Sequence, residues 1–477
     1  MPAVVYCPVR RVSLLAIFMV AGAVTANAQE LGAAVPPEFR VRFFAAQKAS
    51  LDGNYLESLR QAKEVLDMLE DDPRIKRNLA VNHSYLKCMF LAMKSQVLAD
   101  MGASRAASNQ YDAAKRTLEN QKEALARKRL SAALLNDEKA VLEFVEASVH
   151  RPAMDFSLGE FGQADRADSD PFRWRQCLAR CGDELRAAGI TGGRLAGRQL
   201  VELARATMHK PIRPDAPSDE ERYLDAGLFL AEAKMAFQQD PIWKKVVDPK
   251  DPLVFKVVDD ANALGAEIKL EDEVAIKNVI ALVLRDWMEW RLAQAELQSR
   301  QENTDPELGW DTDNAAAQFD EMCNFLRVQY KGDDHPAVYR VRLSRARWFI
   351  FCGLRALDEL DADVGKEEEA DGAEKAVDRA KKIAKARSYV KDALLSLKDM
   401  VATKRVTPLL EEQCAIAELS ALKLQLRLDR VEKKLADDER EKIQQRMDSL
   451  IGELKADEFR QRASGMVDAF GNPKRPK

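Results

Sequence analysis

Histidine is scarce in this chain, and the residues that usually carry catalysis or bind metals form no known motif. Among 477 residues there are four histidines, His83, His150, His209 and His335, and none has a second histidine or a cysteine at helical ligand spacing. The chain has no HExxH, CxxCH or GxSxG motif and no glycine loop ending in Gly-Lys-Ser/Thr. We therefore expect a non-catalytic protein without a cofactor or a metal, and name no site residue.

Aromatic residues and alternating strand patterns are also rare. Aromatic residues make up 7% of the chain and charged residues 32%, a composition typical of long helices with solvated faces. Apolar residues recur every three or four positions, as in Leu56, Leu59, Ala62, Leu66 and Leu69. This period predicts amphipathic helices and an all-α fold.

No apolar run approaches the roughly 20 residues that a membrane-spanning helix needs. The run Val12 to Val24 follows Arg10 and Arg11 and precedes Ala26-Asn27-Ala28. These features predict a secretory signal peptide that is cleaved after Ala28. Since Cys7 precedes the apolar run, we expect no lipid-anchored cysteine at the cleavage site. The mature protein is then exported, periplasmic or extracellular, with no membrane span.

The net charge of the chain bears on its partner, and the spacing of its cysteines bears on disulfides and metal binding. Without residues 1–28 the chain has 72 basic and 78 acidic residues, and this acidic balance disfavours nucleic acid as a partner. The six remaining cysteines are widely spaced and give no disulfide framework. Cys177 and Cys181 share a helical face, which permits a soft metal or a strained disulfide. Packing against the next helix is the favoured interpretation.

Two segments share one pattern. The first runs from Gly53 through Tyr55 and Ser58 to Leu66 and is closed by Asp71-Asp72-Pro73; the second runs from Asn109 to Leu118 with Tyr111 and Ala114 in the matching places. Both resemble the second helix of a tetratricopeptide (TPR) hairpin. The resemblance covers residues 39–130. It implies a helical-hairpin solenoid that binds proteins, although the two tyrosines lie 56 residues apart whereas the family period is about 34.

Breaks in the helical pattern predict the organisation of the chain. Gly189 to Gly197 is predicted to be a flexible turn, and Leu409 to Leu435 with Asp438 to Arg460 a C-terminal helical hairpin. The predicted regions are a signal peptide (1–28), TPR-like hairpins (29–150), a loop-rich connector with helices (151–218), a helical repeat region (219–360), an acidic loop (361–374), C-terminal helices (375–465) and a disordered tail (466–477).

Two residue groups are candidate binding sites. Trp287, Trp290 and Trp348 could line an aromatic groove, but core packing is the favoured interpretation. Arg340, Arg342, Arg345 and Arg347 are distributed around a helix, which favours a solvated face over an anion site.

The function favoured by the sequence is a protein-binding scaffold in the bacterial periplasm or cell envelope, with a partner that the sequence does not identify. An exported all-α enzyme acting on envelope glycans is an alternative. Another is a structural protein that self-associates as a coiled coil through its C-terminal helices, where Leu422 and Leu426 are natural interface residues.

Overall fold

The structure is a computed structural model of the chain. It describes residues 37–73, 83–101, 103–128, 139–147, 171–208, 217–247, 273–301, 312–332, 334–364, 372–398, 408–432, 435–453, 467–468 and 472. The predicted signal peptide, residues 1–28, lies outside these residues.

The chain is all-α, as the apolar periodicity predicts. In chain order the helices are α3 (Pro37–Leu51), α4 (Tyr55–Asp71), α6 (His83–Asp100), α7 (Ser104–Lys128), α9 (Pro171–Ala187), α10 (Arg194–Met208), α11 (Asp219–Phe237), α12 (Pro241–Val246), α14 (Glu273–Gln301), α15 (Thr312–Tyr330), α16 (Pro336–Val364), α17 (Gly372–Leu397), α18 (Pro408–Glu432) and α19 (Asp437–Glu453). Residues 139–147 are also helical.

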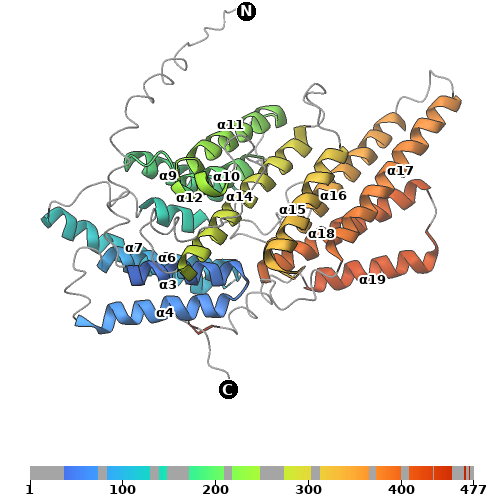
Figure 1. The fold of residues 1–477 in the computed structure, drawn as a ribbon. Coiled ribbons are helices and arrows are strands. Elements are labelled where there is room, and N and C mark those ends of the chain that lie inside the picture. Colours follow the sequence, from blue (N-terminus) through green and yellow to red (C-terminus); the bar gives the residue numbers. More distant parts are fainter. Residues whose placement is uncertain are drawn as a thin grey trace, which may run out of the picture.

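The first two helical pairs form the N-terminal part of the molecule. Helix α3 packs on α4, α4 on α6, and α6 on α7 (Figure 1). The turn after α3 uses Gly53 at φ +79°, in the left-handed region that favours glycine. The Asn54 N–H donates to the Ala49 carbonyl and the Gly53 N–H to the Ser50 carbonyl. These two bonds form a Schellman motif, which ends α3 and reverses the chain.

Helices α9 to α12 follow, and α10 packs closely on α11. The predicted flexible turn from Gly189 to Gly197 is too long, because α10 already begins at Arg194. Gly197 therefore lies inside this helix. A Cβ atom on Gly197 would stand 2.4 Å from the ring of Phe237 on α11, so the absence of a side chain is what lets the two helices approach.

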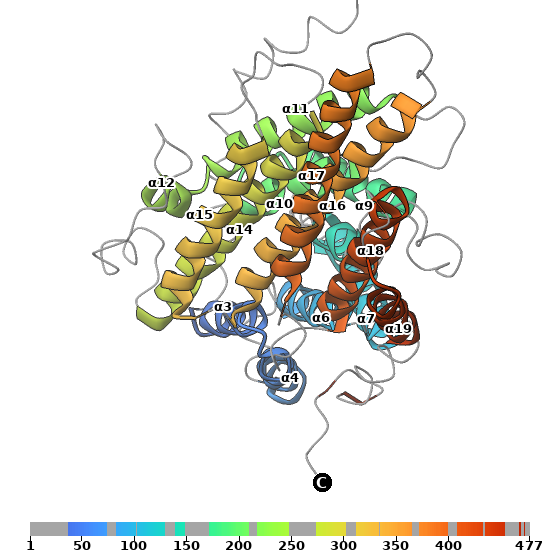
Figure 2. The same ribbon diagram turned by 90° about the vertical axis from the view of Figure 1, so that its right-hand side faces the viewer.

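Helix α14 connects the two ends of the molecule. It packs on α3, on α10 and α11, and on α15 and α16. Figure 2 shows α3 and α4 end-on while α14 to α17 run across the view, so the N-terminal hairpins lie crosswise to the later helices. Trp287 and Trp290 of α14 are 2% and 1% exposed within the largest apolar cluster. Trp348 of α16 is buried in the same cluster, which confirms the core-packing interpretation of all three tryptophans.

Helices α16 to α19 form the C-terminal end, where α18 packs on α16, α17 and α19. The acidic loop predicted at 361–374 is wrong at both ends, because α16 continues to Val364 and α17 starts at Gly372. Two aspartates near the end of a long helix do not prevent its last turn from forming. Leu422 of α18 is buried in a cluster with Met447 and Leu450 of α19. This proposed self-association residue therefore packs within the chain.

Part of the segment predicted to be a disordered tail contacts the N-terminal helices. Val467 is buried beside Leu59 of α4 and Leu98 of α6. The side-chain oxygen of Asn472 accepts a 2.6 Å hydrogen bond from Lys94 Nζ. These contacts place the described residues of 466–477 against the opposite end of the sequence.

Candidate functional site

The described helices form two sites of interest, and the first is an apolar groove at the C-terminal end of the molecule. It encloses about 670 Å³ and is lined by residues of α17, α18 and α19. Its apolar lining consists of Val390, Leu394, Leu395 and Leu397 from α17 and Leu428 from α18. We call it the C-terminal groove.

The groove has a floor that is buried and a wall that is open to solvent. Val390, Leu397 and Leu428 are buried, whereas Leu395 is 51% exposed. An exposed leucine beside a buried apolar floor forms an apolar surface whose contact with water is unfavourable, as at many binding sites. This arrangement suits the apolar face of a helical or extended peptide.

Basic and polar side chains form the rim of the groove. Arg387 of α17 pairs with Glu432 of α18, and Arg446 of α19 donates to Glu418 of α18 at 2.7 and 2.9 Å. Lys391 and Lys398 also line the groove, and their ammonium groups have no ion pair among the residues that the structure describes. Two lysines are thus available to acidic groups of a ligand.

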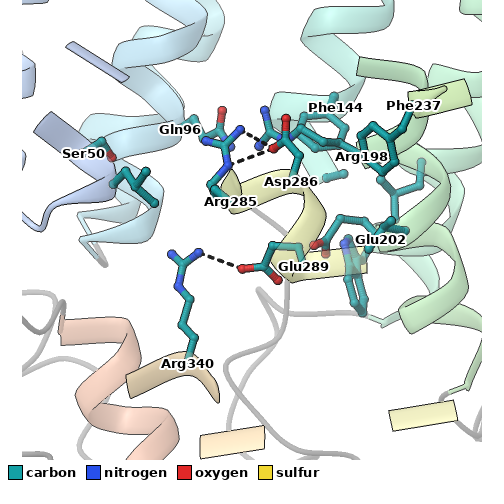
Figure 3. Close-up of a pocket in the computed structure, with 15 residues that line it drawn as sticks. Ser50, Gln96, Phe144, Arg198, Glu202, Phe237, Arg285, Asp286, Glu289 and Arg340 are labelled. Atoms are coloured by element: carbon teal, nitrogen blue, oxygen red, sulfur yellow. Dashed lines mark hydrogen bonds and ion pairs between the residues drawn. The ribbon is translucent and has the colours of Figure 1, made fainter. Parts of the chain in front are cut away.

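The second site is a cavity of about 90 Å³, in which Arg285, Asp286 and Glu289 of α14 lie between Ser50 on one side and Phe237 on the other (Figure 3). We call it the central cavity. It collects residues from helices far apart in sequence. They are Ser50 and Leu51 of α3, Gln96 of α6, Phe144 and Ala147 of the 139–147 helix, Trp174 and Leu178 of α9, Arg198, Val201 and Glu202 of α10, Phe237 of α11, Arg285, Asp286 and Glu289 of α14, and Arg340 of α16.

Asp286 is the most buried charge of this cavity, with 1% of its side chain exposed. Its carboxylate lies 2.7 Å from Arg194 Nε and 3.7 Å from Arg198 Nε, and Arg285 donates to it at 2.6 and 2.9 Å. Burial alone would raise the pKa of Asp286, but the charges of Arg194, Arg285 and Arg198 outweigh it and hold the pKa below its ordinary value. Asp286 is therefore an ionised anchor for three cations.

Arg198 has the least satisfied guanidinium in this group. It stacks over the Phe144 ring at 4.9 Å, and its nearest carboxylate oxygen is the one at 3.7 Å on Asp286. Within the described parts of the chain its side chain makes no hydrogen bond. Burial, together with the like charges of Arg285 and Arg194, lowers the pKa of Arg198 to about 10.

The other end of the cavity is a second ion-pair network. Arg205 Nη1 lies 3.1 Å from Glu202 and 2.7 Å from Glu289, and its Nε is 3.4 Å from Glu296. Burial would lower the pKa of Arg205, but the three carboxylates raise it instead. Arg340 reaches Glu289 from α16 at 3.1 Å. This network joins α10, α14 and α16.

Three of the four arginines predicted to form a solvated face, Arg340, Arg342 and Arg345, instead contact residues outside α16. Besides Arg340, Arg342 donates to the Ser396 carbonyl at 3.0 Å, and Arg345 donates to the Ser396 hydroxyl at 2.7 Å. All four side chains of the series are partly buried. The prediction failed because helical periodicity cannot tell solvent from a polar groove between neighbouring helices.

Cys177 and Cys181, whose spacing permits a metal or redox site, are buried thiols of α9. Cys177 lies near Glu143 and Glu146, so that one ligand atom from each of these three residues falls within 4.8 Å of the others; Cys181 is not part of this group. Arg180 already occupies it, since Arg180 donates to Glu143 at 2.8 Å and to the Cys177 sulfur at 3.2 Å. A guanidinium in this position supplies the positive charge that a metal ion would bring.

The two tyrosines of the TPR-like segments lie in packed positions outside both sites. Tyr55 packs on the apolar cluster that contains Leu59 and Val97. Tyr111 donates a 2.8 Å hydrogen bond to Glu146, and burial with this carboxylate raises the pKa of Tyr111 well above its usual range.

Sequence reasoning missed the residues of the central cavity, although two local signals were present. Arg194 and Arg198 stand four apart on α10, and Arg285-Asp286 interrupts an apolar stretch of α14 between Leu284 and Trp287. An adjacent charge pair inside a buried helix indicates partners on other helices, because an unpaired buried charge is costly.

No protein-family model, curated protein sequence or solved structure matches this chain. In the part of the chain that the structure describes, no helix is both long and apolar enough to cross a membrane.

Proposed function

We propose that this protein is an exported, non-catalytic scaffold of TPR-like helical hairpins that binds a protein partner in the bacterial periplasm or cell envelope. The observation that carries the binding role is the C-terminal groove, with its apolar floor, its exposed Leu395 and its basic rim. Export rests on the signal-peptide pattern of residues 1–28, and the scaffold class on the motif resemblance in residues 39–130.

The chemistry of the groove defines the kind of partner. Leu394, Leu395 and Val390 present an apolar stripe along α17, which fits the apolar face of an amphipathic segment. Lys391 and Lys398 stand on the rim, so acidic residues beside that face would be favoured. We therefore assign the groove to an acidic amphipathic helix of another protein.

A peptide pair tests this assignment directly. One synthetic amphipathic helix carries leucines on one face and flanking glutamates, and its twin carries lysines in place of the glutamates. Fluorescence anisotropy should show saturable binding of the acidic peptide and at least tenfold weaker binding of the basic twin. Equal binding of the two peptides, or no binding of either, would refute the proposed recognition.

Matched variants locate the binding surface. Leu395→Asp should abolish binding of the acidic peptide, and the double variant Lys391→Glu, Lys398→Glu should reverse the preference between the twins. Leu224→Asp is the control, because Leu224 is also an exposed leucine, on α11. If Leu224→Asp lowers the affinity as much as Leu395→Asp does, the groove is not the binding surface.

A crosslinking experiment then tests the biological role. A photo-reactive residue at position 395, with one at position 224 as control, is expressed in the native envelope. A defined protein crosslinked only from position 395, and lost in the Lys391→Glu, Lys398→Glu background, would support the scaffold function. Crosslinks only to a second copy of this chain would replace it with self-association.

A further inference from the structure

We propose that the central cavity binds a small monoanionic ligand through a carboxylate or phosphate group, with Arg198 as its main cation. This site is separate from the C-terminal groove and shares no lining residue with it. The proposal is therefore independent of the protein-binding role.

The first argument is the charge around Asp286. Arg194, Arg198 and Arg285 all lie near this one carboxylate, which balances only one of their three positive charges. Like charges that are partly withdrawn from water repel one another, and a bound monoanion would reduce this repulsion.

The second argument is the position of the uncompensated charge. Arg194 and Arg285 both lie within hydrogen-bond distance of Asp286, whereas Arg198 stands back at 3.7 Å. Phe144 covers one face of the Arg198 guanidinium. The N–H groups at its edge remain available, and this fork matches the two oxygens of a carboxylate or a phosphate.

The third argument is the set of neutral donors around the cavity. Ser50 of α3 and Gln96 of α6 also line it. Neither side chain has a hydrogen-bond partner in the described portions of the protein. A hydroxyl, a primary amide and a guanidinium that line one cavity, and that make no side-chain hydrogen bond within the described residues, form a donor set for an oxyanion.

The volume of the cavity limits the size of the ligand. A water molecule takes roughly 30 Å³ in the liquid, so about 90 Å³ holds a few waters or one small oxyanion. The aromatic walls of Phe144, Trp174 and Phe237 exclude a large hydrated group. The ligand class is therefore a small carboxylic acid or a phosphate-sized oxyanion.

The test uses thermal unfolding and calorimetry of the purified protein with two probes, acetate and inorganic phosphate at pH 6, each compared with chloride at equal ionic strength. A ligand that binds only the folded state raises the melting temperature in a saturable way. We expect such a rise with at least one probe and one binding site per chain. The probe that binds more tightly distinguishes a carboxylate from a phosphate ligand. Equal effects of acetate, phosphate and chloride would overturn the proposal.

Variants assign the effect to the cavity. Arg198→Gln should reduce the affinity at least tenfold, while Arg186→Gln, at an exposed arginine of α9, should leave it unchanged. Ser50→Ala and Gln96→Leu should each weaken binding severalfold, and they keep all the ion pairs that stabilise the fold. Unchanged affinity in Arg198→Gln, or in both Ser50→Ala and Gln96→Leu if Arg198→Gln does not fold, would refute the site.

Discussion

His335 Nε2 lies 3.1 Å from Asp52 Oδ1, and this contact joins the turn after α3 to the start of α16 across 283 positions of sequence. The other ring nitrogen, Nδ1, accepts a hydrogen bond from the Ala337 N–H at 3.1 Å. The proton therefore sits on Nε2, which donates to Asp52. The ring is also stacked on Tyr330, with 3.6 Å between the ring centroids. His335 thus caps α16 and holds the first hairpin against it.

A double-mutant cycle measures this connection. Asp52→Ala and His335→Ala should each destabilise the protein, and the double variant should cost less than the sum of the two. The coupling free energy should be about 1 kcal/mol, the usual contribution of one hydrogen bond. Urea unfolding of the four proteins gives this value. Additive effects would show that the two residues stabilise the fold separately.

Asp52 also predicts a loss of stability in acid. Burial would raise the pKa of Asp52, but hydrogen bonds from His335 and Lys48 and their charges lower it below its usual value. A carboxyl with a lowered folded-state pKa stabilises the fold above its unfolded pKa, and this contribution is lost as the pH falls through the folded-state pKa. The free energy of unfolding should therefore fall less steeply below about pH 4 in Asp52→Asn than in the wild type. Asp183→Asn, at an exposed ion pair, should retain the wild-type slope.

Lys94 predicts a pH dependence of the same sign as that of Asp52, but in mild alkali. Burial lowers the pKa of Lys94 from 10.5 to about 8, and the residue is 3% exposed within α6. Between these two values the unfolded chain binds more protons, so the contribution of Lys94 to stability rises with pH. From pH 7.5 to 9.5 the wild type should gain stability relative to Lys94→Met. Lys442→Met, at a solvated lysine of α19, should track the wild type.

We expect an alanine at position 197 to destabilise the protein, although an alanine inside a helix is usually stabilising. Alanine usually stabilises a helix interior relative to glycine by up to about 1 kcal/mol. At position 197 the added methyl would meet the Phe237 ring at 2.4 Å, so Gly197→Ala should destabilise the protein by about 1–3 kcal/mol. Gly452→Ala on α19 meets no atom within 4 Å and should be neutral or stabilising. The midpoints of urea unfolding compare the two variants.

The helices could be predicted from the sequence because amphipathic periodicity is a local property. The expected C-terminal hairpin, Leu409 to Leu435 with Asp438 to Arg460, has its counterparts in α18 (Pro408–Glu432) and α19 (Asp437–Glu453). The boundaries are less predictable. Residues 361–364 look like the start of an acidic loop but extend α16, since the charge of a segment does not reveal whether the preceding helix continues.

The central cavity could not be predicted, because its residues meet only through the packing of distant helices. Arg194 and Asp286 stand 92 positions apart, and Arg205 and Glu289 stand 84 apart. The sequence contains many charged residues, and no local spacing distinguishes these from solvated ones. The apolar neighbours of Arg285-Asp286 and the spacing of Arg194 and Arg198 are clues to buried charges, but they do not identify the partners.

A comparison of variants at Asp286 and Arg198 distinguishes the contributions of these two residues to stability. Asp286→Asn removes the only carboxylate that Arg194 and Arg198 contact among the described ion pairs, so it should destabilise the fold by about 3–5 kcal/mol, as expected when one partner of a buried ion pair is lost. Arg198→Gln alone should cost much less, because it removes the excess charge. In the double variant, Arg198→Gln should recover part of the stability lost in Asp286→Asn, since fewer like charges then face one another. Urea unfolding of the four proteins measures this, and simple additivity would mean that repulsion among the arginines is already screened.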